Sequence, residues 1–191
     1  MSFSSIAIIA SIVIWLFPAF RQYKTSIFYY FLILALSDPI AYVSVKIFNI
    51  SALDIHSLGG ILLYYSIDMK WENIKKYWVL NLIFIIGFFM AFFTLSNLLF
   101  LLIACHLLIL SKFIKYIIIR LHSLNEIDCF YLVLTFYELT FLVSFIVVLS
   151  QTTIGYLEHY ITLVFQLLIG IFFIVFRYNS RFLLISLKRV T

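Results

Sequence analysis

The sequence predicts an all-α membrane protein with seven transmembrane helices, and three observations lead to this prediction. Of the 191 residues, 65% are hydrophobic and only 11% are charged, whereas a soluble domain carries roughly 25% charged residues. The apolar residues gather in separate segments, most of which approach the roughly 20 residues that a helix needs to cross a bilayer. When these segments are threaded as seven crossings, almost all Lys and Arg residues fall on one side. We expect a single domain over residues 1–191.

Turn and charge signals separate the helices from one another. The first apolar run has no preceding Lys or Arg and no small-x-small cleavage site, so we expect it to be retained. Ser51 and Asp54 have the spacing of a capping box before the third helix, as do Ser123 and Glu126 before the sixth. The fifth helix is expected to extend past the bilayer into the cytoplasm. The expected helices cover residues 4–20, 26–48, 52–67, 77–93, 94–121, 126–150 and 158–176.

The short third segment, 52–67, decides the predicted topology. If it crosses, every Lys and Arg except Lys46 lies on one side; if it is re-entrant, Arg21 and Lys24 face away from the later basic loops. Because basic loops stay in the cytoplasm, we predict a full crossing, with the N-terminus outside and the C-terminus inside. The segment 177–191 then forms a basic amphipathic cytoplasmic tail. The predicted location is the bacterial cytoplasmic (inner) membrane, as a multi-pass protein.

Polar side chains inside the apolar segments form a candidate site, because ionisable groups at membrane depth are costly. Asp38 and Glu138 are expected at similar depths on the second and sixth helices, with His106 closer to the inner face. Tyr131, Thr135 and Glu138 follow i, i+4, i+7 spacing, which places them on one helix face. The candidate intramembrane residues are Asp38, Tyr42, His106, Tyr131, Thr135, Glu138 and Gln166.

Two interpretations of these residues stay open. They form a ligand or ion site, or a proton-sensitive switch, between the second, fifth and sixth helices. Alternatively, Asp38 and Glu138 are both protonated and join helices by hydrogen bonds.

The remaining chemistry-bearing residues favour no enzyme, metal site or cofactor. His56 and His159 lie at outer helix ends, where an interfacial or structural role is expected rather than haem ligation. Cys105 and Cys129 lie in or beside apolar helices, so neither a disulfide framework nor a metal site is predicted. Phosphate-binding loops and hydrolase motifs are absent from the sequence.

Basic residues near the inner face are expected to bind anionic headgroups or a protein partner. They lie in the stretches SKFIKYIIIRL and RYNSRFLLISLKRV, which mix apolar with basic residues, as segments do that lie at headgroups. The net charge of +5 is attributed to membrane topology and not to nucleic-acid binding. The expected contact residues are Lys112, Lys115, Arg120, Arg177, Arg181, Lys188 and Arg189.

Three segments, LFPAFRQYKTSIFYYFLILALSDPIAYV, DIHSLGGILLYYSI and LEHYITLVFQLLIGIFFIVFRY, carry a resemblance. Together they resemble small seven-helix membrane proteins of Bacteroidota and related bacteria, which are similar to membrane regions of some sensor kinases. The resemblance implies that Asp38, His56 and His159 occupy positions that often hold polar residues, and it implies no particular activity.

From these observations we expect a non-enzymatic sensory or scaffolding subunit of the membrane. Because the chain shows no kinase, receiver or DNA-binding segment, we expect it to act through a separate membrane or cytoplasmic protein partner. The alternative is a small transporter or channel that uses the intramembrane carboxylates Asp38 and Glu138.

Overall fold

The computed structural model describes residues 3–67, 75–150 and 155–187, although the side chains of 3–9, 150–160 and 163 lie outside that description. Within these ranges the protein is all-α, apart from two three-residue strands. A π-helical turn, η1 (Ser44–Phe48), continues α2. The helices are α1 (Phe3–Arg21), α2 (Phe28–Val43), α3 (Ala52–Ser66), α5 (Trp78–Thr94), α6 (Leu99–Leu124), α7 (Cys129–Ser150) and α8 (Gly155–Val175).

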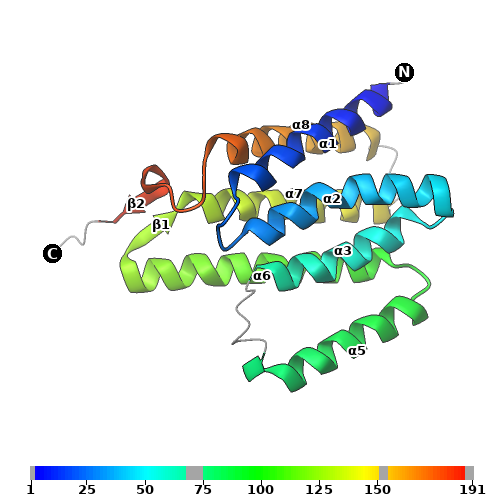
Figure 1. The fold of residues 1–191 in the computed structure, drawn as a ribbon, viewed down its shortest axis with the longest axis horizontal. Helices are drawn as coiled ribbons and strands as arrows, with labels where there is room; N and C mark the ends of the chain where they lie inside the picture. Colours follow the sequence, from blue (N-terminus) through cyan, green and yellow to red (C-terminus); the bar gives the residue numbers. More distant parts are fainter. Residues whose placement is uncertain (1–2, 68–74, 151–154, 188–191) are drawn as a thin grey trace.

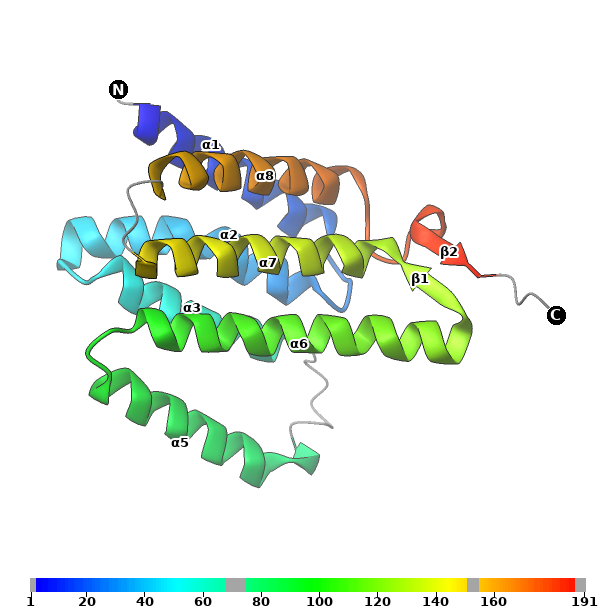
Figure 2. The ribbon, with the colours of Figure 1, turned by 180° about the vertical axis from the view of Figure 1, so that it is seen from behind.

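Six of the described helices close into a ring. Each of α1, α2, α3, α6, α7 and α8 packs against the next, and α8 packs back against α1. Helix α5 lies outside this ring and contacts it mainly through α6 (Figures 1 and 2). The interior of the ring is therefore built from side chains that are far apart in the sequence.

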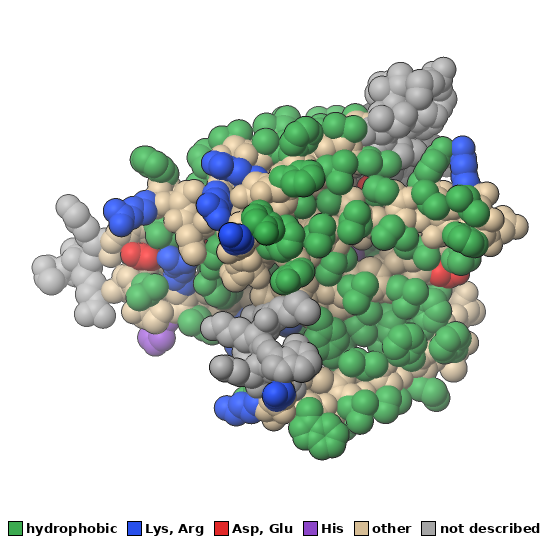
Figure 3. All heavy atoms as spheres, viewed as in Figure 1, with side chains coloured by type: hydrophobic (Ala, Val, Ile, Leu, Met, Phe, Trp, Pro, Cys, Tyr) green, Lys and Arg blue, Asp and Glu red, His purple; other side chains and the backbone are tan. Residues whose placement is uncertain are grey.

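The helices are compatible with a membrane protein. Three described helices are long and apolar enough to cross a bilayer: Phe28–Phe48, Leu99–Leu124 and Cys129–Leu149. Helix α3 spans only about 22 Å at 1.5 Å per residue, less than the roughly 30 Å hydrocarbon core. Hydrophobic side chains cover most of the face shown in Figure 3, and Lys and Arg gather mainly toward the end where the C-terminus lies. The number of crossings and the orientation stay predictions.

The predicted N-cap of the third helix is present, whereas that of the sixth is wrong. The Ser51 hydroxyl accepts a hydrogen bond from the Leu53 amide at 3.2 Å. Before α7, residues Glu126–Asp128 form strand β1, and the Asp128 carboxylate accepts from the Phe130 amide at 3.0 Å. Since Asp128 is an equally good capping residue, the helix begins three residues later than the capping-box pattern predicts.

The fifth helix begins at Leu99 and not near Thr94. The Asn97 side chain accepts a hydrogen bond from the Leu99 amide at 3.0 Å, so it satisfies one of the open donors at the start of α6. An asparagine inside an apolar run thus acts as a helix boundary.

The described part of the C-terminal tail is not a free amphipathic helix. A short 3₁₀ turn, η2 (Arg181–Leu183), leads into strand β2 (Leu184–Ser186), which pairs antiparallel with β1. The Leu187 amide also donates to the Asn125 carbonyl at 2.8 Å. The tail is therefore docked on the connection between α6 and α7 through backbone hydrogen bonds to β1 and to Asn125.

Close packing between α1 and α8 yields a stability prediction. A Cβ at Gly170 would lie 2.8 Å from the Cγ2 atom of Ile14, a β-branched side chain that cannot rotate away freely. We expect Gly170→Ala to lower the free energy of unfolding by about 1–3 kcal/mol, measured by thermal unfolding in detergent. Gly87→Ala is the control, since nothing lies within 4 Å of its added Cβ. Equal effects at both positions would contradict the packing argument.

Candidate functional site

A buried carboxylate, Glu138 of α7, joins three helices inside the ring. Its Oε1 atom accepts a hydrogen bond from the Tyr30 hydroxyl of α2, and its Oε2 atom lies 2.6 Å from Nδ1 of His106 on α6. Glu138 and Tyr30 are fully buried, and His106 is 4% exposed. We call these residues the Glu138 cluster. Because hydrocarbon cannot satisfy an ionisable group, the two partners explain how this position tolerates a carboxylate.

Aromatic side chains fix the imidazole of His106. Its ring stacks on Phe141, with centroids 5.2 Å apart and an interplanar angle of 24°, and it also contacts Phe145. Glu138, Phe141 and Phe145 lie three and four residues apart, so they share one face of α7. The same helix face therefore supplies both the carboxylate and the rings that orient its partner.

A cavity of about 570 Å³ adjoins the cluster, in the half of the ring nearer the α2–α3 connection. His106 forms part of its wall, together with apolar and aromatic side chains such as Trp15, Tyr137 and Phe141. Its other polar lining residues come from α1, α2, η1, α3 and α8: Ser11, Ser37, Asp38, Tyr42, Lys46, His56 and Gln166.

Ionisable groups form a continuous series from the cavity to the cluster. Asp38, His56 and His106 all line the cavity. His106 in turn contacts Glu138.

The other half of the ring is sealed by packed aromatic rings. Phe31, Phe113, Phe130 and Phe173 are all fully buried. Ring centroids lie 4.9 Å apart for Phe31 and Phe173, and 5.0 Å apart for Phe130 and Phe173. None of these four residues lines the cavity. Among the described residues, the cavity therefore stops short of these four rings and meets the Glu138 cluster only at His106.

The structure brings most of the predicted site residues together. Asp38, Tyr42, His106 and Gln166 line the cavity, and Glu138 adjoins it through His106. The sequence paired Glu138 with Asp38 by depth, but in the described structure Glu138 bonds to His106 and Tyr30. The pairing differs because the depth of a residue does not reveal which helices are neighbours.

Two predicted members lie elsewhere on α7. Tyr131 stacks on Tyr116, with ring centroids 4.0 Å apart. Thr135 donates its hydroxyl to the Tyr131 carbonyl at 2.7 Å, so it is satisfied within its own helix.

His56 lies in α3 and lines the cavity, so it is not simply an interfacial residue. The side chain of His159 lies outside the described residues.

Two of the predicted headgroup contacts bind within the protein. Lys112 donates to the Tyr64 carbonyl at 2.7 Å, in the last turn of α3, where a cation is favoured by the helix dipole. Arg120 lies 2.7 Å from the buried Asp128 carboxylate and 3.5 Å from Glu126. These two residues therefore have structural partners. Lys115, Arg177 and Arg181 are exposed. Lys188 and Arg189 lie outside the described residues.

Sequence reasoning missed Tyr30 and Gln22. Tyr30 follows Tyr29 in the first turn of α2, which is also the pattern of an interfacial aromatic pair. The sequence holds one weak sign that Tyr30 belongs to the polar site, because it lies about two helical turns before Asp38 on the same helix. Gln22 is fully buried, and its side chain donates to the Phe176 carbonyl and accepts from the Tyr178 amide, both at 2.9 Å. Its position between Arg21 and Tyr23 gave no sign of burial.

No protein-family model, curated protein or solved structure matches this chain. In the described part of the chain, no three His, Cys, Asp or Glu side chains are placed to hold a metal ion. Functional inference therefore depends on the cavity and on the Glu138 cluster.

Proposed function

We propose that this protein is a sensory subunit of the bacterial cytoplasmic membrane that binds a small molecule or a proton in its cavity. The chain would cross the membrane seven times, with its N-terminus outside, and act through a protein partner. One observation carries the proposal: the cavity is walled by His106, which bonds to a buried carboxylate that joins three helices. A mainly apolar cavity that stops at packed side chains suits binding better than passage.

The lining of the cavity limits the class of ligand. Trp15, Tyr137 and Phe141 offer apolar contact area, whereas Asp38, Lys46 and His56 offer charge and hydrogen bonds. Ligand sites commonly combine an apolar lining with a few placed polar groups. A small, largely apolar molecule with a polar or charged group complements this lining.

The Glu138 cluster provides a means of transmitting occupancy. A ligand or proton at Asp38 or His56 changes the electrostatic field at His106, which shares a short hydrogen bond with Glu138. Proton position within that pair sets the strength of the bonds among α2, α6 and α7. Helix α6 runs on to Leu124, so a small shift between helices would reach the basic end of the bundle. The physical requirement is only that the ligand bind the two arrangements unequally.

The proton is a usable probe while the ligand is unidentified. Trp15 lines the cavity and lies 4.5 Å from Tyr137 by ring centroid, so its fluorescence should report on the cavity. In nanodiscs, with Trp71→Phe and Trp78→Phe in the background, we expect emission to change as the pH falls and histidine side chains take up protons.

The matched variants separate a specific response from a general one. His56→Gln and Glu138→Gln should abolish the fluorescence change or shift its midpoint. His122→Gln removes an exposed histidine of α6 and should leave the change intact. A response that is the same in all variants, or absent in the parent, would count against the proposal.

The proposed protein partner is tested by a separate measurement. Purification from native membranes in mild detergent should recover a protein in fixed stoichiometry with this chain. A lone monomer would contradict the subunit role but not ligand binding.

The transporter alternative is favoured by the series of ionisable groups from Asp38 through His56 and His106 to Glu138. Flux in proteoliposomes should then fall in Asp38→Asn and Glu138→Gln. The same background leak in parent and variants would exclude it, as the aromatic seal leads us to expect.

A further inference from the structure

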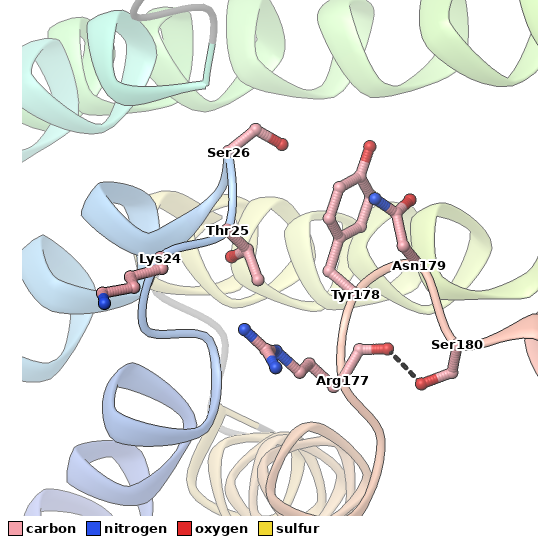
Figure 4. Close-up of a pocket in the computed structure, with 7 residues that line it drawn as sticks. All are labelled: Lys24, Thr25, Ser26, Arg177, Tyr178, Asn179 and Ser180. Atoms are coloured by element: carbon pink, nitrogen blue, oxygen red, sulfur yellow. Dashed lines mark hydrogen bonds between the residues drawn. The ribbon is translucent and has the colours of Figure 1, made fainter.

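A second cavity of about 550 Å³ lies where α1, α2 and the segment after α8 meet. Lys24, Thr25 and Ser26 form one wall, and Arg177, Tyr178, Asn179 and Ser180 form the other (Figure 4). None of these lining residues is acidic. We propose that this cleft binds the phosphate group of an anionic phospholipid. The inference does not depend on the sensory role.

Hydrogen-bond donors in the cleft suit a phosphate. Lys24 and Arg177 are exposed cations on opposite walls, and Ser26 is a further exposed lining residue. In Figure 4 the Lys24 side chain points outward and the Ser26 hydroxyl points to the other side, so the Arg177 guanidinium is the cation that reaches between the walls. Arg177 uses one Nη2–H to bind the Tyr23 carbonyl at 3.0 Å, which leaves most of the five guanidinium donors for a ligand. Charge-assisted bonds from several donors are the usual basis of phosphate recognition.

The start of α2 supplies a further attraction. Its N-cap residue, Ile27, makes no side-chain capping bond, and residues 25 and 26 of the cleft come immediately before it. The amides of a first helical turn carry partial positive charge and favour anions; in α2 the Phe28 amide already bonds to the Thr25 carbonyl at 3.2 Å, so the attraction comes from the charge of the helix end. This contribution supplements the two cations.

Hydrogen bonds within the protein hold the two walls of the cleft in place. Buried Gln22 bonds to the Phe176 carbonyl and to the Tyr178 amide, and Arg177 reaches across to the α1–α2 turn. Thr25 and Ser180 use their hydroxyl protons on backbone carbonyls of Gln22 and Arg177. A ligand therefore meets preformed walls, which reduces the entropy cost of binding.

The apolar surroundings point to a phospholipid and not to free phosphate. Near the cleft, Phe20 of α1 is 76% exposed, Tyr23 is 57% exposed and Val175 of α8 is 56% exposed. Acyl chains would cover such side chains, while the phosphate would sit at headgroup level. Polar-tipped Tyr and Lys side chains commonly occupy this boundary. Free phosphate would use the donors but gain nothing from the apolar rim.

Lipid retention measures the proposed site directly. The full chain is purified in detergent, titrated with phosphatidylglycerol or with phosphatidylcholine, and examined by native mass spectrometry and thermal unfolding. We expect one tightly held phosphatidylglycerol and a raised unfolding temperature. Since each basic residue near anionic lipid contributes about a fivefold effect, Lys24→Gln with Arg177→Gln should weaken retention by roughly tenfold or more.

Controls distinguish the site from general attraction. Lys115→Gln removes the same charge from an exposed position of α6 where the sequence also predicts headgroup contact. Because Lys115 lies outside the cleft, the one tightly held lipid should still be retained. Lys24→Gln alone keeps the Arg177 contact with Tyr23, so it tests binding if the double variant folds poorly. Inorganic phosphate, added without lipid, tests the second source. Equal loss in Lys115→Gln, no loss in Lys24→Gln, or stabilisation by phosphate but not by phosphatidylglycerol would each overturn the proposal.

Discussion

Replacing Glu138 by leucine is expected to lower the free energy of unfolding by about 2–4 kcal/mol. The substitution leaves the Tyr30 hydroxyl and the His106 imidazole buried without their shared acceptor, in a region with 0–4% exposure. Thermal unfolding in detergent, followed by circular dichroism and gel filtration, measures the loss. Leu139→Ala, at a half-exposed neighbouring position, should cost much less.

A double-mutant cycle with His106→Phe tests whether the contact itself is responsible. We expect a coupling free energy above about 0.5 kcal/mol, as contacting residues show. Independent effects of the two substitutions would contradict a direct pair. Combining Tyr30→Phe, His106→Phe and Glu138→Leu removes the whole cluster and should restore much of the stability, because buried polar networks are often replaceable by apolar residues.

The triple variant also separates sensing from adhesion between helices. If the cluster only joins helices, a stable apolar version should keep every function of the protein. If the cluster transmits a signal, the triple variant should fold and yet give no fluorescence response in Trp15. A signalling role therefore predicts that this variant keeps its free energy of unfolding but loses the Trp15 fluorescence response.

Replacing Gln22 by leucine is the second large expected effect, at about 2–3 kcal/mol. Its amide is the shared partner of the Phe176 carbonyl and the Tyr178 amide, and it lies 3.4 Å from the Phe173 carbonyl. Leucine has a similar size but neither donor nor acceptor, so the end of α8 would lose its buried partners. The ring is expected to loosen where α1 meets α8.

Gln166→Leu makes the same chemical change at the cavity wall and serves as the control. Gln166 is only partly buried, so its loss should change the unfolding temperature little. Limited proteolysis near residues 177–180 should become faster in Gln22→Leu and stay unchanged in Gln166→Leu. The reverse order of the two variants would refute the role assigned to Gln22.

Hydropathy predicted the helical segments because long apolar runs have few alternatives to a helix in a bilayer. Boundaries were less certain, since Asn97 and Asp128 cap helices that other patterns placed differently. The prediction of an amphipathic tail was wrong because strand β2 pairs with β1, which lies more than fifty residues earlier in the sequence.

Site partners were predictable only in part. Residue type and depth correctly singled out Asp38, His106 and Glu138 as polar groups within the apolar helices. They did not reveal that His106 and not Asp38 bonds to Glu138, because neighbour relations come from the closing of the ring. Tyr30 could not be identified from the sequence for the same reason, because its hydroxyl gains Glu138 as a partner only when the ring brings α2 and α7 together.

Helix α5 illustrates a different consequence of that ring. Since α3 contacts α6 directly, the ring of six helices closes without α5, which lies between those two helices in the sequence. Phe88 is the one residue that α5 buries fully among its seventeen. Helix α5 is thus held on the ring by a small buried cluster, in which Phe88 packs with Ile61, Leu101 and Cys105. We expect substitutions on the exposed face of this helix to leave the polar interior undisturbed.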